Sequence, residues 1–133
     1  MPGCVLRATG DAFQVDSFLE ESSFEPWAVY RKGERRSENR VWHTSGMNIL
    51  VSDASGEDLM LQVRDAVAFL EKNKEKLSRL RSCVGVEAVE LDFGINRKNV
   101  FVQCSFFPPE LTKIAGEFGM GFVVRKCLWC STG

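Results

Sequence analysis

The stretch SGEDLMLQVRDAVAFLEKNKEKLSRLRS (residues 55–82) carries the strongest pattern in the chain. Its apolar residues recur three or four positions apart, which gathers them on one side of a helix, so we predict a long amphipathic helix that packs on a core. The apolar stripe consists of Leu59, Val63, Ala66, Val67, Leu70, Leu77 and Leu80. Ser55, with Asp58 three residues later, can cap the free N–H groups at its start. Lys74 stands where the stripe requires an apolar residue, so we expect the last turns either to diverge from the core or to be stabilised mainly by their charges.

The segment that follows alternates between apolar and polar residues, as strands do. The run VEAVELDFGINRKNVFVQCSFF (residues 86–107) contains two alternating stretches joined by a polar turn, which predicts a β-hairpin. The apolar face of the first stretch holds Val89, Leu91 and Phe93. The matching face of the second holds Val100, Val102, Cys104 and Phe106. We expect the helix stripe to pack on both faces, with Cys104 as a core thiol.

Shorter patterns flank these two segments. Strands are predicted at residues 4–10, 27–34, 40–52 and 121–129, and helices at residues 13–23 and 108–119. This order predicts an α+β fold of three successive β-α-β units, with a mostly antiparallel sheet and the helices on one side, as in ferredoxin-like folds. No linker-like stretch divides the chain, so we expect residues 1–133 to form a single α+β domain.

Short motifs along this order resemble those of one family. They are the turn YRKGE (residues 30–34), the pair Val41-Trp42, and the sequence FPPEL (residues 107–111) that opens the last helix. Together with the spacing of the elements, they resemble the bacterial domain-of-unknown-function family numbered forty-two seventy-nine over residues 4–129. The resemblance implies a bacterial intracellular protein with the fold of that family, and it implies no reaction.

Composition excludes several partners. The chain has 133 residues and a formal net charge of −1, so it has no overall positive field that would attract nucleic acid or an anionic membrane surface. No apolar run approaches the ~20 residues that span a bilayer, and the first residues lack the pattern of a signal peptide. We therefore expect a cytoplasmic protein that binds neither a membrane nor nucleic acid.

The five cysteines, an odd number, are scattered along the chain and are expected to be thiols. Cys127 and Cys130 form a C-x-x-C pair, which can be two structural thiols, half of a zinc site or a redox centre. A redox pair usually needs a following helix to lower the pKa of its first thiol, and only three residues remain after Cys130. A zinc site needs two further ligands, and no second pair of suitable spacing is present. We favour structural thiols and expect no metal and no cofactor.

His43 is the only histidine, so any Ser–His or Cys–His mechanism must use it. Its surroundings, WHTS, contain no nucleophile motif. Glu90 and Asp92 lie on one face of a predicted strand and could act as paired carboxylates, although such pairs more often protect a sheet edge. We predict no catalytic residue. The alternative function is a small hydrolase or transferase that uses His43 with Glu90 or Asp92.

The segment YRKGERRSENR (residues 30–40) concentrates positive charge beside aromatic residues. Guanidinium groups and aromatic rings together suit an anionic ligand, although a solvated loop can have the same composition. We predict a non-catalytic binding or protein-interaction module whose ligand-binding residues are Tyr30, Arg31, Lys32, Arg35, Trp42 and His43. The expected partner is a protein or a small acidic ligand, and the sequence leaves homodimer formation open.

Overall fold

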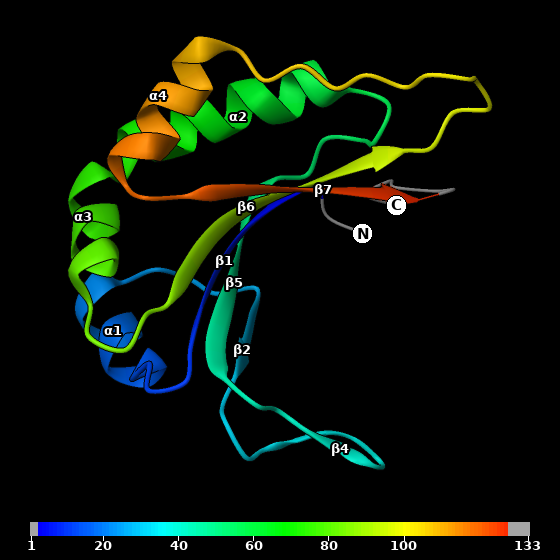
Figure 1. Cartoon of the computed structure of the whole chain (residues 1–133). Helices are drawn as coiled ribbons and strands as arrows, with labels where there is room; N and C mark the ends of the chain where they lie inside the picture. Colours follow the sequence, from blue (N-terminus) through cyan, green and yellow to red (C-terminus); the bar gives the residue numbers. More distant parts are fainter. Residues whose placement is uncertain (1–2, 128–133) are drawn as a thin grey trace.

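The computed structural model describes residues 3–127, which form a five-stranded sheet, four helices and a separate two-stranded hairpin (Figure 1). The strand order is β2-β5-β1-β6-β7. The strands are β1 (Cys4–Gly10), β2 (Ala28–Tyr30), β5 (Ser45–Ser52), β6 (Ala88–Asn96) and β7 (Gly121–Cys127). β5 and β6 are antiparallel to β1, β2 is antiparallel to β5, and β7 is parallel to β6. The chain is therefore an α+β protein with a mostly antiparallel sheet, as predicted.

Each helical connection joins two strands that point the same way. The helices are α1 (Val15–Ser22), α2 (Leu59–Lys72), α3 (Lys74–Ser82) and α4 (Pro109–Glu117). α1 connects β1 to β2, α2 and α3 connect β5 to β6, and α4 connects β6 to its neighbour β7. The helices lie together over one face of the sheet (Figure 1). The finer, ferredoxin-like assignment remains a prediction.

Alternation along the central strands separates a face under the helices from a face without them, which we call the open face. On β1, Leu6 and Ala8 are fully buried under the helices, whereas Arg7 and Thr9 point to the open face. The core also contains Met47, Ile49, Val89, Leu91 and Phe93 from the sheet and Val63, Ala66, Leu70, Leu77, Leu80 and Leu111 from the helices. Because each buried leucine contributes about 1.5–3 kcal/mol, this layer supplies much of the folding free energy. The predicted packing of the helix stripe on the first alternating stretch is confirmed.

The long predicted helix is divided at Asn73, which is the last cap of α2 and the first cap of α3. The Asn73 side-chain Nδ2 donates to the Phe69 carbonyl at 2.9 Å, and so satisfies one of the carbonyls that end α2. Leu77 and Leu80 of α3 are nevertheless buried in the core, so the expectation that the last turns diverge from the core is wrong. At the other end, the cap is Asp58, whose carboxylate accepts from the Leu61 N–H at 3.1 Å, rather than Ser55.

The second strand of the predicted hairpin is absent from the described structure. Residues 97–107 are irregular, and Val100, Val102, Cys104 and Phe106 are exposed instead of lining the core. The reason is that β6 pairs with β1 along one edge and with β7 along the other. A strand has only two hydrogen-bonding edges, so no edge of β6 is left for a hairpin partner.

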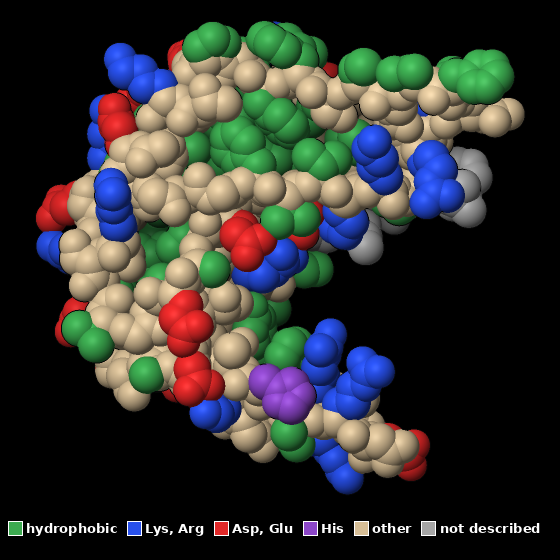
Figure 2. All heavy atoms as spheres, viewed as in Figure 1, with side chains coloured by type: hydrophobic (Ala, Val, Ile, Leu, Met, Phe, Trp, Pro, Cys, Tyr) green, Lys and Arg blue, Asp and Glu red, His purple; other side chains and the backbone are tan. Residues whose placement is uncertain are grey.

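The small hairpin consists of β3 (Arg35–Ser37) and β4 (Arg40–Val41), inserted between β2 and β5. It projects away from the sheet on the side opposite the helices (Figure 1). The space-filling view shows the surface hollowed between this hairpin and the sheet, with Lys and Arg side chains and the histidine bordering the hollow (Figure 2). This hollow is the part of the open face that holds the candidate site.

Candidate functional site

A pocket of about 420 Å³ lies where the β3-β4 hairpin meets the open face, and we call it the hairpin pocket. Its lining consists of Arg7, Thr9, Tyr30, Arg36, Trp42, His43, Thr44 and Asn48. The volume falls within the range of sites that hold small molecules, about 300–1,000 Å³. Tyr30, Trp42 and His43, which were predicted to bind a ligand from the sequence, are brought together here.

Two stacked aromatic rings form one wall of the pocket. The ring centroids of Tyr30 and Trp42 are 4.3 Å apart with an angle of 21° between the planes. Tyr30 pairs with Gly46 across β2 and β5, and its ring lies directly over this glycine, where a Cβ would be only 2.6 Å from the ring. Trp42 is held by its backbone, because its N–H donates to the Glu34 carbonyl and its carbonyl accepts from the Gly33 N–H, both at 2.9 Å. The positions of both rings are therefore fixed by strand pairing and backbone hydrogen bonds.

Arg36 lies over the indole of Trp42, with Cζ 4.6 Å from the ring centroid. This cation–π contact holds the guanidinium flat against the ring and leaves the N–H groups at its edge able to donate. No carboxylate of the described residues forms an ion pair with Arg36. Arg36 is thus a positioned cation whose charge is not neutralised by any carboxylate within residues 3–127.

A second cation enters the pocket from the sheet. Arg7 Nη2 donates to Asp92 Oδ2 at 2.8 Å, and Arg125 Nε donates to Asp92 Oδ1 at 3.2 Å. The Asp92 side chain is only 4% exposed, and a buried carboxylate needs such charged partners to offset its desolvation. Glu90 pairs with Arg7 across β1 and β6, so this part of the open face carries charges of both signs.

Asn48 supplies an unused polar group to the same pocket. Its Oδ1 is buried and has no hydrogen-bond partner among the described residues. A buried acceptor without a partner costs free energy, typically about 1–3 kcal/mol, so a bound donor would relieve that cost. Asn48 lies in this pocket because the register of β1 with β5 pairs it with Arg7, which is also a lining residue.

Tyr30 remains neutral beside these charges. Burial raises its pKa; the carboxylate of Glu90 acts in the same direction, and the guanidinium groups of Arg7 and Arg36 oppose it. These influences indicate that the phenol lies within electrostatic reach of both arginines. It can act as a hydrogen-bond donor or acceptor at neutral pH.

Arg31 and Lys32, also predicted to bind a ligand, form ion pairs outside this lining. Arg31 reaches Asp16 at 2.7 and 2.8 Å and Glu34 at 3.4 Å, and Lys32 Nζ lies 2.8 Å from Asp11 Oδ1. The hydrogen bond from Arg31 lowers the pKa of Asp16 below its ordinary value. These pairs attach the turn after β2 to α1 and to the loop before it.

Arg35, the remaining predicted ligand residue, is the neighbour of Arg36 in β3. The strand register shifts between Arg35 and Ser37, and Arg35 is not among the described residues that line the hairpin pocket. Ligand binding by Arg31, Lys32 and Arg35 stays a prediction.

Sequence reasoning did not select Arg7, Thr9, Arg36 or Asn48 as ligand-binding residues. The sequence did contain a signal for Arg7 and Thr9. They alternate with buried residues along CVLRATG, so they must lie together on the other face of that strand. Asn48 is a polar residue within an apolar strand. Their convergence depends on the register of β1 with β5, which no local pattern reveals.

The residues of the alternative catalytic function are not assembled around His43. The lining that contains His43 includes no carboxylate, and Asp92 is occupied by Arg7 and Arg125. A general base needs to lie within hydrogen-bond reach of the group that it serves. Neither Glu90 nor Asp92 therefore lies among the described residues that line this pocket with His43.

The cysteines show no metal site within the described residues. Cys4, Cys83 and Cys104 are free, whereas Cys127 is disulfide-bonded, so the expectation of a thiol is wrong for Cys127. Cys130 lies outside the described residues. In residues 3–127 no group of three or more His, Cys, Asp or Glu side chains is placed to hold a metal ion.

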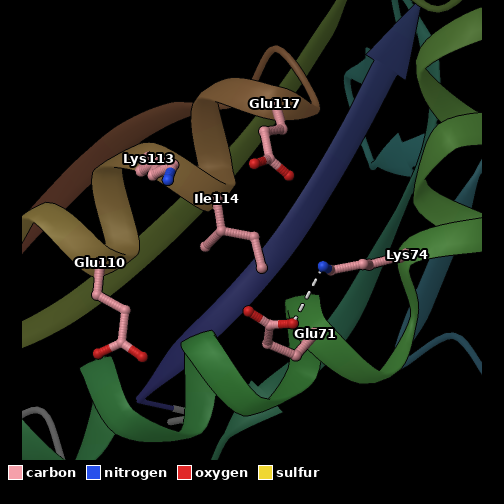
Figure 3. Close-up of a pocket in the computed structure, with 6 residues that line it drawn as sticks. All are labelled: Glu71, Lys74, Glu110, Lys113, Ile114 and Glu117. Atoms are coloured by element: carbon pink, nitrogen blue, oxygen red, sulfur yellow. Dashed lines mark ion pairs between the residues drawn. The ribbon is translucent and has the colours of Figure 1, made fainter.

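A second depression, of about 290 Å³, lies between α2 and α4 (Figure 3). Its lining alternates in charge and comprises Glu71, Lys74, Glu110, Lys113, Ile114 and Glu117. Lys74 Nζ pairs with Glu71 Oε2 at 3.2 Å. Exposed pairs of this kind are usually solvated and contribute little, so the hairpin pocket remains the better candidate.

The chain matches the model of one protein family. A family model described as a domain of unknown function, DUF4279, matches residues 2–126. No curated protein and no solved structure matches the chain. Across residues 3–127, none of the helices combines the length and apolar character that crossing a membrane requires.

Proposed function

The chain belongs to the DUF4279 family, and we propose that it is a non-catalytic binding module that takes a small acidic ligand in the hairpin pocket. The bacterial, cytoplasmic setting expected from the sequence is part of this proposal. The family description assigns no activity, so the argument depends on the geometry of the pocket.

The observation that carries the proposal is the mismatch of charge in the lining. Arg7 and Arg36 line the pocket, and no carboxylate of residues 3–127 lies among the lining residues. Arg7 is paired with Asp92, so Arg36 is the lining cation that has no ion-pair partner among the described residues. Guanidinium groups form their strongest hydrogen bonds with carboxylates and phosphates, often through two parallel N–H donors. A ligand that carries such a group would complete the charge balance that the chain leaves open.

The other polar groups define the rest of the ligand. Asn48 Oδ1 needs a donor, and the hydroxyl groups of Thr9, Tyr30 and Thr44 can donate or accept. A compound with an acidic group at one end and an N–H or O–H donor a few atoms away fits this arrangement. An acidic side chain of a partner protein offers the same carboxylate, and a flexible segment could present it.

The test is a screen by ligand-observed NMR with pairs of small molecules. Each acid, for example 4-hydroxybenzoate, is compared with its uncharged amide, here 4-hydroxybenzamide. The expected result is that acids bind at least tenfold more tightly than their amides. Equal binding of acids and amides, or no binding by any acid in the panel, would refute the proposal.

Neighbouring arginines of the hairpin provide matched variants. Arg36→Gln should weaken binding of the acid roughly 10- to 100-fold, since a hydrogen bond to a charged group contributes about 1.5–3 kcal/mol. Arg35→Gln removes the same charge from the adjacent residue of β3, which does not line the pocket, and should change affinity less than about threefold. If the two variants lose affinity equally, attraction is a general charge effect and the pocket is not the site.

A further inference from the structure

Residues 97–107 connect β6 to α4 as an extended chain without a strand partner among the described residues, and we call this segment the arm. It projects along α2 beyond the end of the sheet (Figure 1). Four of its large apolar side chains are strongly exposed: Val100 at 57%, Phe101 at 109%, Val102 at 73% and Phe106 at 68%. So dense an apolar surface on one short segment indicates an interaction site.

The arm is held in this position by its own contacts. The Gln103 side chain donates to the Asn96 carbonyl at 2.7 Å and accepts from the Lys98 N–H at 2.9 Å. At its end, Phe107 packs on the rings of Phe93 and Phe122, with centroids 5.0 and 5.1 Å away. The exposed apolar side chains are therefore presented by an anchored segment, which reduces the entropy lost on binding.

An apolar groove begins at Pro108, the residue that follows the arm, and we call it the α2 groove. Its volume is about 470 Å³, and its lining comprises Met60, Val63, Arg64, Val67, Ala68, Pro108 and Glu110. Pro108 follows the last residue of the arm, so the groove begins where the arm ends. Hydrophobic side chains follow one another along this edge in the space-filling view (Figure 2).

We propose that this surface is a two-fold interface in which the arm of each of two copies of this chain packs into the α2 groove of the other. An interface between identical copies must complement itself, so a projection and a matching groove have to occur on one surface. Here both do. A different protein could bind either the arm or the groove and would not require both.

Charge also supports a second copy as the occupant. Arg97 and Lys98 precede the apolar part of the arm, and Arg64 and Glu110 line the groove, so both signs are present on the surface. A two-fold rotation can then place Arg97 and Lys98 of one arm near Glu110 of the other copy. The net charge of −1 causes little repulsion between copies.

The position of Cys104 gives the proposal a specific geometry. Phe101 of one copy must reach a groove that begins at Pro108 of the other, so the two-fold axis passes the arm about midway between these residues. Cys104 is exposed and lies in that interval. The two Cys104 thiols should therefore lie close together in the dimer.

The experiment measures the mass of the protein by sedimentation velocity through a micromolar concentration series. Dimerisation is expected, and Phe101→Glu on the arm and Met60→Glu on the groove should each raise the dissociation constant at least tenfold. Val84→Glu is the matched control, because Val84 is an equally apolar residue that is 87% exposed between α3 and β6. Circular dichroism checks that each variant is folded.

Crosslinking provides a second, independent readout. A short bis-maleimide should join two copies, and Cys104→Ser should abolish the product, whereas Cys83→Ser should leave it unchanged. A chain that stays monomeric throughout the series would overturn the proposal. So would equal effects of Phe101→Glu and Val84→Glu, or a monomer whose arm instead binds lipid vesicles.

Discussion

Replacing Gly46 by alanine should destabilise the fold and displace the aromatic wall of the hairpin pocket. A Cβ at this position would lie 2.6 Å from the Tyr30 ring and 2.7 Å from the carbonyl oxygen of Ala8, where ordinary contacts begin at 3.4 Å. The tyrosine ring could rotate away. The carbonyl cannot, because Ala8 lies in the central strand β1 and is paired on both sides.

The expected cost follows from these two contacts. Forcing extra atoms into a packed site usually costs about 1–3 kcal/mol. If Tyr30 moves, the stack on Trp42 is lost as well, which removes about 0.5–1.5 kcal/mol. With a urea m-value of about 1–3 kcal/mol per molar for a small protein, the unfolding midpoint should fall by roughly 1 M.

The assay is urea unfolding followed by far-ultraviolet circular dichroism, with Gly121→Ala as the matched control. Gly121 also lies in a strand, β7, but a Cβ there would meet nothing within 4 Å. Gly46→Ala should therefore be clearly less stable than Gly121→Ala. Equal free energies of unfolding for the two variants would refute the close approach of Tyr30 and Ala8 to Gly46.

Two further predictions test the core and the site. Leu70→Ala should lower the free energy of unfolding by about 2–5 kcal/mol because Leu70 is fully buried, whereas Leu61→Ala on the same helix, 38% exposed, should cost much less; equal costs would contradict the orientation of α2. Tyr30 is the only tyrosine and its pKa is raised mainly by burial, so tyrosinate absorbance should titrate with a midpoint above the usual value of about 10. Above about pH 10 the folded state keeps a proton that the unfolded state has lost. The contribution of Tyr30 to the free energy of unfolding is therefore fully present below about pH 10 and is lost as pH rises through the folded pKa. Tyr30→Phe should remove this pH dependence, and a titration midpoint at the usual value would contradict the burial of Tyr30.

The helices were accessible from the sequence because their pattern is local. The spacing of Leu59, Val63, Ala66 and Leu70 depends only on the turn of the helix, and these side chains do pack on the core or lie buried in it. The division at Asn73 was not predicted, because Lys74 interrupts the stripe but Leu77 and Leu80 of α3 return to the core.

The candidate site was accessible only in part. The turn after Tyr30 was recognisable from its aromatic and basic residues, and Tyr30, Trp42 and His43 share a pocket. Arg31 and Lys32 looked equally suitable in the sequence, yet Asp16 and Asp11 pair with them. Those acidic partners are distant in the chain, so composition could not distinguish ion-paired cations from available ones.

The sequence by itself determined the local elements: the faces of the helices, the alternation of the strands and the presence of a cationic aromatic turn. The tertiary structure decided which strand edges are used and which side chains meet. Residues 99–107 have the alternation of a strand, but β7 occupies the edge of β6 that they would need. Arg7 and Asn48 meet only through the register of β1 with β5. Pairing of this kind joins residues far apart in the chain, and a strand has only two edges, so competition among all the strands decides the outcome.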